Sequence, residues 1–344
     1  MRAWADRPRS RGSLRARSGA TSSSEAERAG GQGPGRRGPA RPLDGPTSPT
    51  LAPVDDPEFT RERPRLLGVA YRITGSRADA EDIVQDAWLR WQRTERATIE
   101  RPEAWLTTVT SRLALDRLKS AQRTREDYIG PWLPEMANTG PGPADHAEMS
   151  ESLTVGFLTV LERLGPVDRV VFLLADVFGY PFDEIATVVD KSPEACRQIA
   201  SRARRRVRED RPRYEPTDQD AWDVAAAFLV AAEAGDLDGL LQMLSEGAVL
   251  VSDGGAEHHA ARRPIVRERI PRFISNIVQR RQARLGPDVE VVPEEINGQP
   301  GVVIRAAGRP VYAATLAIAD GKVDRIWIMV NPDKLSKLDA PPVA

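Results

Sequence analysis

The sequence of 344 residues contains little of what a disulfide-bonded, metal-binding or membrane protein needs. Cys196 is its only cysteine, which excludes a disulfide framework or a cysteine zinc site within one chain and favours a reducing, cytoplasmic environment. No apolar run approaches the roughly 20 residues that span a bilayer, so we expect no membrane contact. The net charge of -1 and 40% hydrophobic residues are typical of a globular chain long enough for about two or three domains.

Residues 1–55 are expected to form a disordered basic tail. Met1 to Pro53 is rich in Arg, Ser, Gly and Pro, and it has too few hydrophobic residues to bury a core. The stretch also lacks the apolar segment of a secretory signal. Two alternatives stay open for this tail: it contacts nucleic acid non-specifically, or it results from a translation start upstream of the true one.

Proline and glycine divide the rest of the chain into helical and mixed segments. Residues 56–128 are expected to be helical, and the linker 129–150 contains "GPWLPEMANTGPGP", whose prolines and glycines prevent a continuing helix. Residues 151–213 form a second helical segment. Residues 217–335 open with an alanine-rich helix and end in the strand-like runs "DVEVV", "GVVIRAA", "PVYAATLAIA" and "VDRIWIMV", before a tail over 336–344.

An amphipathic helix is predicted for "DAEDIVQDAWLRWQ", residues 79–92. At helical spacing, one arc carries the core-type residues Ala80, Ile83, Val84, Ala87, Trp88 and Trp91. The opposite arc carries Glu81, Asp82, Gln85, Asp86 and Gln92 around the isolated Leu89. Two interpretations of this polar arc are open: it is a solvated face, or it is a docking surface for a basic partner.

The helix expected from Pro102, in "RPEAWLTTVTSRLALDRLKSAQRTR", has a second polar side. Its buried side is predicted to contain Trp105, Leu106, Val109 and Leu113. Its outer side is expected to offer hydroxyl, amide and cationic groups, namely Thr108, Ser111, Arg112, Lys119, Gln122 and Arg123. Such groups neutralise phosphate charge and donate hydrogen bonds, which suits a nucleic-acid backbone, although a solvated face is the alternative.

A helix-turn-helix is predicted for "GYPFDEIATVVDKSPEACRQIASRARRRVRED". Asp183 and Glu184 favour the start of the first helix, and Ser192 favours the start of the second. The second helix is expected to bury Ala195, Cys196, Ile199, Ala203 and Val207. The residues of this helix expected to point outwards are Glu194, Arg197, Gln198, Ser201, Arg202 and Arg205. Such a helix can lie in the major groove, where Arg and Gln read base edges; the alternative is a basic surface helix of a bundle.

Both helical segments resemble a bacterial RNA polymerase sigma factor of the extracytoplasmic-function group. The resemblance rests on four blocks in the expected order: "LLGVAYRITGSRADAEDIVQDAWLRW", "RPEAWLTTVTSRLALDRLK", "LERLGPVDRVVFLLADVFGYPFDEIA" and "SPEACRQIASRARRRV". It implies two all-α domains, the second with the helix-turn-helix. It also implies a factor that directs promoter-specific initiation, with core polymerase and promoter DNA as partners and without catalytic residues, cofactor or metal of its own.

The same resemblance assigns roles to the polar surfaces. The helix over 79–92 would dock on the clamp helices of the polymerase β′ subunit, with both β and β′ as partners, through Asp82, Gln85, Asp86 and Leu89. The loop from Thr94 to Arg101 and the next helix would open the minus-ten element and hold a flipped base. On that helix the DNA contacts would be Arg112, Lys119 and Arg123. The minus-thirty-five element would be read by Glu194, Arg197, Gln198, Ser201, Arg202 and Arg205.

The third segment resembles an α+β SnoaL-like domain, a curved sheet wrapped by helices around a pocket. The resemblance rests on "DVAAAFLVAAEAGDLDGLLQMLSEGAVLVSDGG", a following basic helix and a strand-rich end. Sigma factors of the sigma-J type carry such a domain as an in-chain regulator, and their "WLPEP", "DGGGK" and "NPDKL" motifs correspond here to "WLPEM", "DGGAE" and "NPDKL". The regulatory contacts so implied are Trp132, Leu133, Pro134, Asp253, Gly254, Gly255, Asn331, Pro332, Asp333, Lys334 and Leu335.

Two other functions stay open for the third segment. His258 and His259 lie beside Asp253 and Glu257, and a base near neutral pH could serve the acid-base chemistry of a cyclase. Adjacent histidines on a polar loop are more often surface residues. Alternatively, the SnoaL-like pocket could bind a small ligand, and the chain would then be a one-component DNA-binding regulator that works without polymerase.

Overall fold

The computed structural model describes residues 56–126, 128, 130–139, 153–210, 219–255, 260–286, 289–336 and 338–339. The tail expected over residues 1–55 lies outside these ranges, and so do His258 and His259. Asp55–Ala344 forms one compact unit. Within the described ranges, no helix is long and apolar enough to cross a membrane.

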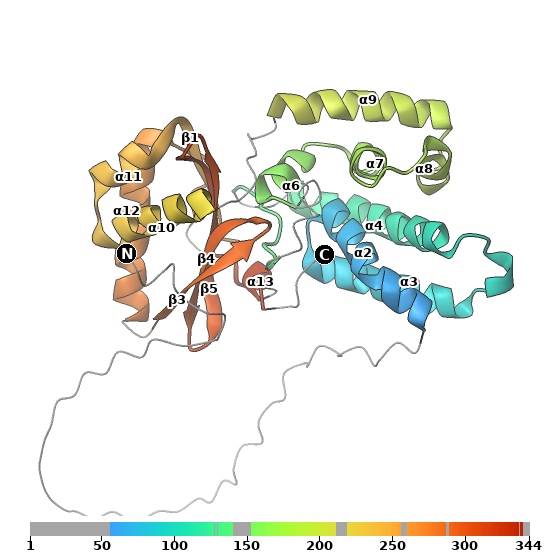
Figure 1. The fold of residues 1–344 in the computed structure, drawn as a ribbon, viewed down its shortest axis with the longest axis horizontal. Coiled ribbons are helices and arrows are strands. Elements are labelled where there is room, and N and C mark those ends of the chain that lie inside the picture. The colour runs from blue at the N-terminus through green and yellow to red at the C-terminus, as the bar shows by residue number, and fades with distance from the viewer. Residues whose placement is uncertain are drawn as a thin grey trace, which may run out of the picture. The chain divides into compact units, whose positions relative to one another are not determined.

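The first helical domain contains α2 (Pro57–Thr74), α3 (Arg77–Arg93) and α4 (Pro102–Glu126), with a 3₁₀ turn, η1 (Arg96–Thr98), before α4 (Figure 1). The apolar stripe predicted on α3 is buried, except that Trp88 is half-buried. The Trp88 ring packs on the ring of Phe59 in α2, with 4.9 Å between their centroids.

Asp56 connects the start of α2 with the last turn of α3 and with η1. Its carboxylate accepts hydrogen bonds from the backbone N–H groups of Glu58 and Phe59 at 3.0 and 3.1 Å, which caps α2. It also accepts the Trp91 indole N–H at 3.1 Å and pairs with Arg96. Burial raises the pKa of the Asp56 carboxyl, but these hydrogen bonds and the arginine charge outweigh burial, so its pKa is lowered.

The second helical domain contains α6 (Val155–Leu161), α7 (Pro166–Phe172), a π-helical turn η3 (Leu173–Val177), α8 (Phe182–Val189) and α9 (Pro193–Asp210). α8 and α9 form the predicted helix-turn-helix. Asp190 ends α8 with a left-handed backbone at φ 54°, and the Ser192 hydroxyl accepts the Ala195 N–H at 3.2 Å to cap α9. The buried stripe of α9 is confirmed, with Ala195 half-buried and Ala200 as an additional buried residue.

The C-terminal domain is built on a six-stranded sheet in the order β2-β1-β6-β5-β4-β3. β1 runs parallel to β6, and the other neighbours are antiparallel. The strands are β1 (Leu244–Asp253), β2 (Ile265–Val266), β3 (Val289–Ile296), β4 (Gln299–Ala306), β5 (Arg309–Ala319) and β6 (Lys322–Met329). The four predicted runs are β3 to β6, whereas β1, directly after a helix, was not predicted as a strand.

The two faces of this sheet are covered differently. One face packs on α10 (Gln219–Ala234), α11 (Leu237–Met243) and α12 (Ile270–Leu285), which follows the turn η4 (Arg267–Arg269), and the shared core includes Phe228, Leu240, Ile274, Leu250 and Ile326. On the other face, Trp327 and Met329 pack with Leu133 and Met136 of the linker, Val155 of α6, and Leu335 of α13 (Pro332–Leu335). The linker is therefore part of the core of the C-terminal domain.

Candidate functional site

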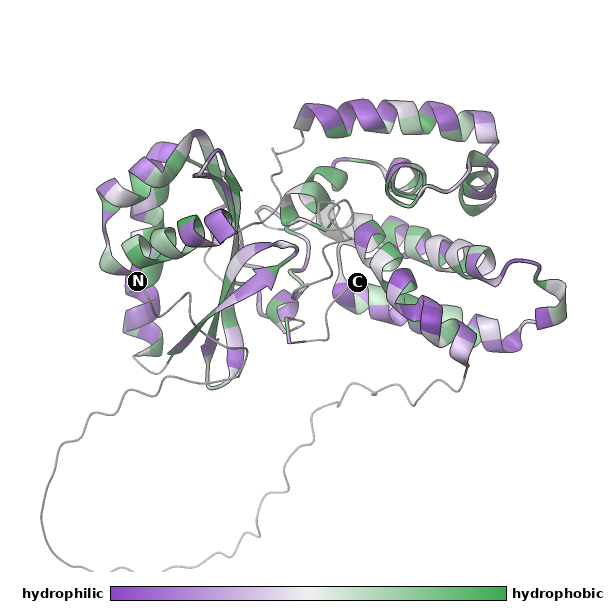
Figure 2. Cartoon of the chain, in the orientation of Figure 1, coloured by the Kyte–Doolittle hydropathy of each residue, from purple (hydrophilic) through white to green (hydrophobic). Residues whose placement is uncertain are grey.

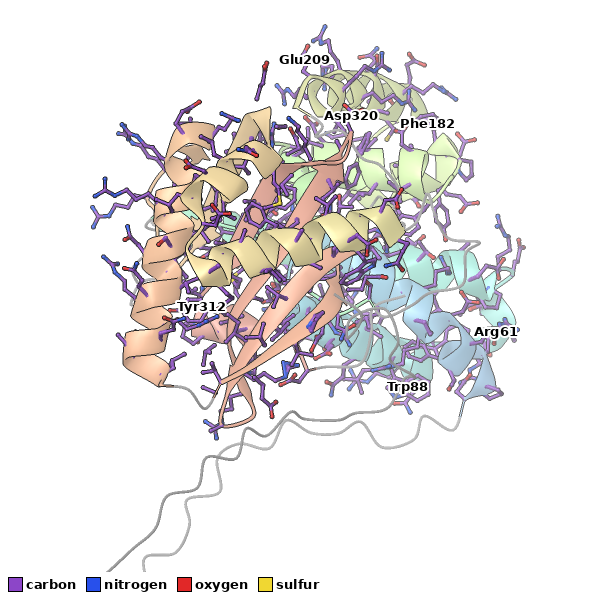
Figure 3. The ribbon with its side chains drawn as sticks, turned by 60° about the vertical axis from the view of Figure 1, so that its left-hand side comes forward. Arg61, Trp88, Phe182, Glu209, Tyr312 and Asp320 are labelled. Carbon is purple, nitrogen blue, oxygen red and sulfur yellow. The ribbon has the colours of Figure 1, made fainter. Side chains whose placement is uncertain are left out.

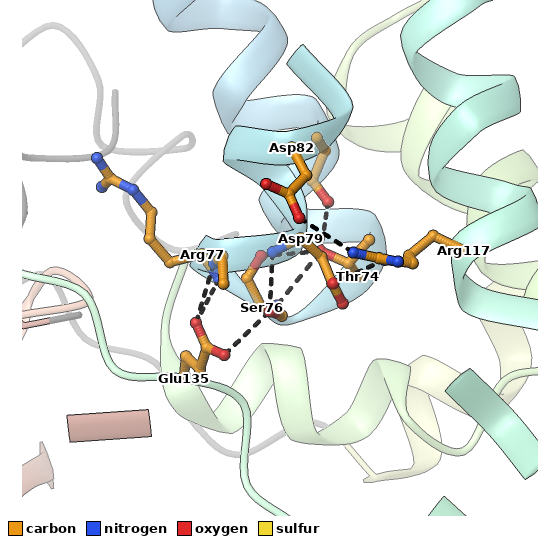
Figure 4. Close-up of polar contacts among 9 residues, drawn as sticks. Thr74, Ser76, Arg77, Asp79, Asp82, Arg117 and Glu135 are labelled. Carbon is orange, nitrogen blue, oxygen red and sulfur yellow. Dashed lines mark hydrogen bonds and ion pairs between the residues drawn. The ribbon is translucent and has the colours of Figure 1, made fainter. Parts of the chain in front are cut away.

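The outer face of α3 presents the residues expected to dock on polymerase. Asp82, Asp86 and Leu89 are exposed, with Leu89 39% exposed, and Gln85 is half-buried. Arg117 of α4 pairs with Asp79 at 2.7 Å and with Asp82 at 3.2 Å (Figure 4). These pairs are solvent-exposed and contribute little stability, so they do not close this face to a partner.

The outer side of α4 differs from its prediction. Arg112 and Lys119 are exposed, and the side chain of Arg123 lies outside the described residues. The prediction that Ser111 points outwards is wrong. Its side chain is fully buried, as is that of Thr110. α4 packs on α7 and α8 as well as on α2 and α3, so part of the arc that an isolated helix would leave in water is covered.

The outer face of α9 carries all of the predicted DNA-reading residues at the surface. Glu194, Arg197, Gln198, Ser201, Arg202 and Arg205 are exposed, and hydrophilic residues predominate along this helix (Figure 2). Arg197 lies over the ring of Phe182 at 5.6 Å and pairs with Glu194 at 3.2 Å. Arg204 and Arg206 instead turn to Asp176 and Asp168 of their own domain, at 2.7 and 3.6 Å.

The first helical domain is in direct contact with the second through polar groups that the sequence did not reveal. The Tyr180 hydroxyl is 2.8 Å from the Thr107 hydroxyl and also accepts a hydrogen bond from Arg65. Arg112 donates to the carbonyl of Thr187 in α8, so one predicted DNA contact is occupied by protein. Two further contacts join the domains, Arg101 to Glu184 at 2.7 Å and Arg169 to the Ile73 carbonyl at 3.0 Å.

A buried cluster joins the linker, the end of β1 and the C-terminal segment; we call it the linker cluster. At its centre is the ion pair between Asp253 and Lys334, 2.7 Å apart, with both residues buried. The Asp253 carboxylate accepts the backbone N–H of Leu133 at 2.9 Å, and the Lys334 ammonium donates to the Leu133 carbonyl at 2.6 Å. Both backbone groups of this linker residue are thus held by one charged pair.

Aromatic rings complete the linker cluster. The Lys334 ammonium lies 3.8 Å from the ring centroid of Trp132 and 5.2 Å from that of Tyr128. The Tyr128 hydroxyl donates to Asp253 and accepts from the Asn331 amide, the latter at 3.1 Å. Burial, together with the Asp253 carboxylate, raises the pKa of Tyr128. Asn331 also caps α13, because its side chain accepts the Asp333 N–H at 3.1 Å.

The glycine loop after β1 fits closely into the linker cluster. The Gly255 N–H donates to Asp253 at 3.1 Å, and the backbone of Gly255 has φ 66°. A Cβ there would meet the Asn331 side chain at 3.0 Å, so glycine is required for both reasons. Gly254, Pro134 and Leu335 are buried, whereas Pro332 and Asp333 are exposed. The structure thus brings the "WLPEM", "DGGAE" and "NPDKL" segments together, apart from the loop residues outside the described ranges.

Glu135 links the linker to the start of α3, and its role was not predicted. Its buried carboxylate accepts the Ser76 hydroxyl at 2.9 Å and the backbone N–H groups of Arg77 and Ala78 at 2.6 and 3.3 Å (Figure 4). Burial raises the pKa of Glu135, and these hydrogen bonds only partly offset that effect. The Glu135 backbone N–H also donates to the Gly75 carbonyl at 2.8 Å, at the turn between α2 and α3.

Asn297 was also missed, and it joins three parts of the chain. It lies in the tight turn between β3 and β4, fully buried, with φ 53°. Its amide group donates to the Tyr71 hydroxyl of α2 and to the Leu153 carbonyl before α6, both at 2.8 Å, and accepts the Ala137 N–H at 2.9 Å. The "NG" dipeptide between two strand-like runs is typical of such a turn, but it does not indicate that the turn is buried.

Comparison with known proteins identifies the family. Residues 59–124 match Sigma-70 region 2 and residues 155–207 match Sigma-70, region 4. The chain is 40% identical over 295 residues to the ECF RNA polymerase sigma factor SigJ of Mycobacterium tuberculosis, which covers 81% of this chain and 92% of SigJ. The chain belongs to the ECF RNA polymerase sigma factors.

Other comparisons agree with this assignment. The sigma factor is 35% identical over 281 residues to the probable ECF sigma factor SigI of M. tuberculosis, covering 81% of this chain and 93% of the relative. The crystal structure of M. tuberculosis SigJ matches it with a TM-score of 0.66 at 37% identity, over 83% of this chain and 99% of that one. The expected fold class is confirmed: two helical sigma domains followed by a SnoaL-like domain.

The family assignment bears on the main alternative raised by the sequence, a one-component DNA-binding regulator. Regions 2 and 4 are the parts of a sigma factor that bind RNA polymerase and promoter DNA, which favours a sigma factor over a one-component regulator. Among the described residues of this sigma factor, no group of three or more His, Cys, Asp or Glu residues is placed to hold a metal ion.

The C-terminal domain of the sigma factor contains a pocket of about 480 Å³ between α12 and the sheet. Its described lining is Ser252, Ala260, Phe273, Asn276, Ile277, Arg280, Ala283, Arg284, Tyr312, Ile328 and Val330. Within the described residues, this lining includes no carboxylate and no histidine.

Proposed function

We propose that the C-terminal domain regulates this sigma factor by holding its two helical domains in a closed arrangement. The observation that carries the proposal is the polar contact between α4 and α8 together with the linker cluster. Arg112, expected on minus-ten DNA, donates instead to Thr187 at the end of α8. One residue proposed to contact minus-ten DNA is therefore engaged by the domain proposed to contact the other promoter element.

The geometry of a promoter supports this proposal. The minus-ten and minus-thirty-five elements are separated by about two turns of duplex DNA, roughly 70 Å. In the closed arrangement α4 and α8 are within hydrogen-bonding distance of each other. The helical domains must separate before α4 and α9 can reach both elements at once, so any contact that opposes separation opposes transcription.

The C-terminal domain has two connections that oppose separation. The linker cluster fixes Leu133 through the buried pair of Asp253 and Lys334, and breaking such a pair by removing one partner costs about 3–5 kcal/mol. Asn297 donates to the first helical domain at Tyr71 and to the segment that opens the second at Leu153. One turn of the sheet therefore joins both helical domains.

The remaining roles follow from the family and from exposure. The exposed face of α3 would dock on the β′ clamp helices, with β and β′ of core polymerase as partners, and the exposed face of α9 would read minus-thirty-five DNA. The chain would act in the cytoplasm, where core polymerase acts. The polymerase would supply all covalent chemistry, as in the family to which the chain belongs.

Promoter-specific transcription with reconstituted holoenzyme tests whether the C-terminal domain restrains the sigma factor. Asn297→Gly keeps the left-handed turn and removes the side chain that joins the two helical domains, so transcript yield at limiting sigma factor should rise several-fold. Asp320→Gly is the matched control, because Asp320 has φ 52° in the turn between β5 and β6 and is exposed. Equal or lower yield from Asn297→Gly, relative to both wild type and the control, would contradict the proposal.

A further inference from the structure

The pocket in the C-terminal domain carries chemistry that neither the helical domains nor the linker cluster uses. Its volume, about 480 Å³, lies within the range of small-molecule sites. Its inner wall is apolar and contains Phe273, Ile277, Ile328 and Val330. An apolar wall of this size with aromatic residues suits the body of a small organic molecule rather than an inorganic ion.

Among the described pocket-lining residues, the charged side chains all have one sign. Arg280 and Arg284 lie one turn apart on α12, line the pocket and are exposed, and neither makes an ion pair or hydrogen bond with another described residue. Arg281 of the same helix shows the contrast: it is buried and holds Glu233 through two hydrogen bonds of 2.6 Å. Arg281 is therefore committed to the fold, whereas the guanidinium groups of Arg280 and Arg284 are available to an anion.

Neutral hydrogen-bonding groups accompany these charges. Tyr312 lies on the side of the sheet that packs with α12 (Figure 3), and its hydroxyl has no hydrogen-bond partner within the described part of the chain. The Asn276 amide lies on α12, one turn before Arg280. A carboxylate or similar anionic group at this end of the pocket would find charged donors first and neutral donors beside them.

The pocket and the linker cluster share two strand ends. Ser252 lines the pocket, while the next residue, Asp253, holds Leu133 and Lys334 on the opposite face, as the alternation of side chains along a strand requires. Val330 also lines the pocket and precedes Asn331, and its N–H donates to the Asp253 carbonyl at 2.8 Å. A molecule that displaces Ser252 or Val330 must therefore act on Asp253 or Asn331.

We propose that this pocket binds a small organic anion with an aromatic or otherwise apolar body, and that its occupancy changes the linker cluster through the ends of β1 and β6. The binding site stands on its own residues. Its effect on transcription rests on the regulatory function proposed above, so binding and transcription are tested separately.

Calorimetric titration of the full chain tests the binding site, with naphthylacetate as the anionic probe and naphthylacetamide as its neutral counterpart. Naphthylacetate should bind roughly tenfold or more tightly, because charge-assisted hydrogen bonds require the carboxylate. The double variant Arg280→Gln with Arg284→Gln should lose this preference. Arg272→Gln, an exposed arginine of α12 that does not line the pocket, should keep it. No binding, equal affinity for both probes, or an unchanged preference in the double variant would overturn the proposal.

Transcription at saturating naphthylacetate tests the link to the linker cluster. Promoter-specific transcript yield from wild type and from Arg272→Gln should change at least about twofold, while the amide at the same concentration should have no effect. Unchanged yield despite saturation would overturn the link and leave the binding site intact. The Asn297→Gly result is obtained without any probe, so failure of the regulatory proposal itself is distinguished by that variant.

Discussion

The outer face of α3 is exposed at Asp82, Asp86 and Leu89, whereas the corresponding side of α4 lies against α8 and buries Ser111. Both faces were expected to contact other macromolecules, the first polymerase and the second DNA. Within the described residues, the polymerase face is free of hydrogen bonds and ion pairs to the second domain, whereas Arg112 on α4 donates to Thr187 of α8. Under the proposed function, this difference means that closure would oppose DNA contact by α4 and leave polymerase docking possible, so docking would precede opening.

The largest effect should follow from changing the open face. Asp82→Arg with Gln85→Ala places a cation where a basic partner is expected, and binding to core polymerase should weaken roughly a hundredfold or more, because like charges at an interface cost several kcal/mol. Co-sedimentation with core polymerase measures this affinity. Glu246→Arg, a charge reversal at an exposed position of β1, is the control and should bind normally. Normal binding by the double variant would show that α3 is not the docking face.

Breaking the linker cluster should have the next largest effect. Lys334→Met leaves the Asp253 carboxylate buried without its cation, and the free energy of unfolding should fall by about 3 kcal/mol. Adding Asp253→Asn should recover part of that loss, as a double-mutant cycle in urea unfolding would show. Lys322→Met, at an exposed position of β6, should change stability by less than about 0.5 kcal/mol. Strictly additive losses would mean that the pair has no net interaction.

A smaller effect is expected at the covered face. Tyr180→Phe removes the hydroxyl shared by Thr107 and Arg65, which destabilises the closed arrangement by about 1–3 kcal/mol, and transcription at limiting sigma factor should rise several-fold. The exposed pair of Arg101 and Glu184 contributes at most about 1 kcal/mol, so Arg101→Ala should change transcription far less. A larger effect from Arg101→Ala than from Tyr180→Phe would contradict the assigned contact.

The smallest effect concerns the pH dependence of Glu135. Burial raises its pKa above the ordinary value of 4.5, so its contribution to stability is full below that value and is lost as the pH rises through the raised pKa. Glu135→Gln does not titrate. The stability of wild type relative to this variant should therefore fall between about pH 4 and pH 7. Urea unfolding of both proteins at both pH values measures this difference in the free energy of unfolding. A difference that stays constant or rises with pH would exclude a raised pKa of Glu135.

More of the fold than of the contacts between distant segments could be predicted from the sequence. Apolar periodicity located α3 and α9, because burial on one side of a helix leaves a regular pattern in sequence, and runs of strand-forming residues located β3 to β6. The error at Ser111 shows the limit of the same reasoning: small hydroxyl residues are compatible with solvent and with a tight helix contact, and only the packed neighbours of α4 decide between them.

Contacts between distant segments left less signal. The "WLPEM", "DGGAE" and "NPDKL" segments could be related to one another only through family resemblance, although Asp253, Lys334 and Leu133 prove to be in contact. Asn297 had no such guide, and the resemblance assigned no contact to Glu135, although this residue lies within the "WLPEM" segment. A turn asparagine and a linker glutamate are ordinary surface residues in most chains, and their burial here depends on tertiary contacts that a single sequence does not encode locally.

The distance between the two helical domains tests the central claim most directly. Spin labels at Arg93→Cys in α3 and Arg208→Cys in α9, with Cys196→Ala to remove the native thiol, report that distance in the full chain by pulsed electron resonance. We predict one narrow distance distribution in the free protein, a shift of the population to longer distances in Asn297→Gly, and a longer distance still with core polymerase and promoter, whose two elements lie roughly 70 Å apart. The same distribution in all three samples would contradict closure by the C-terminal domain.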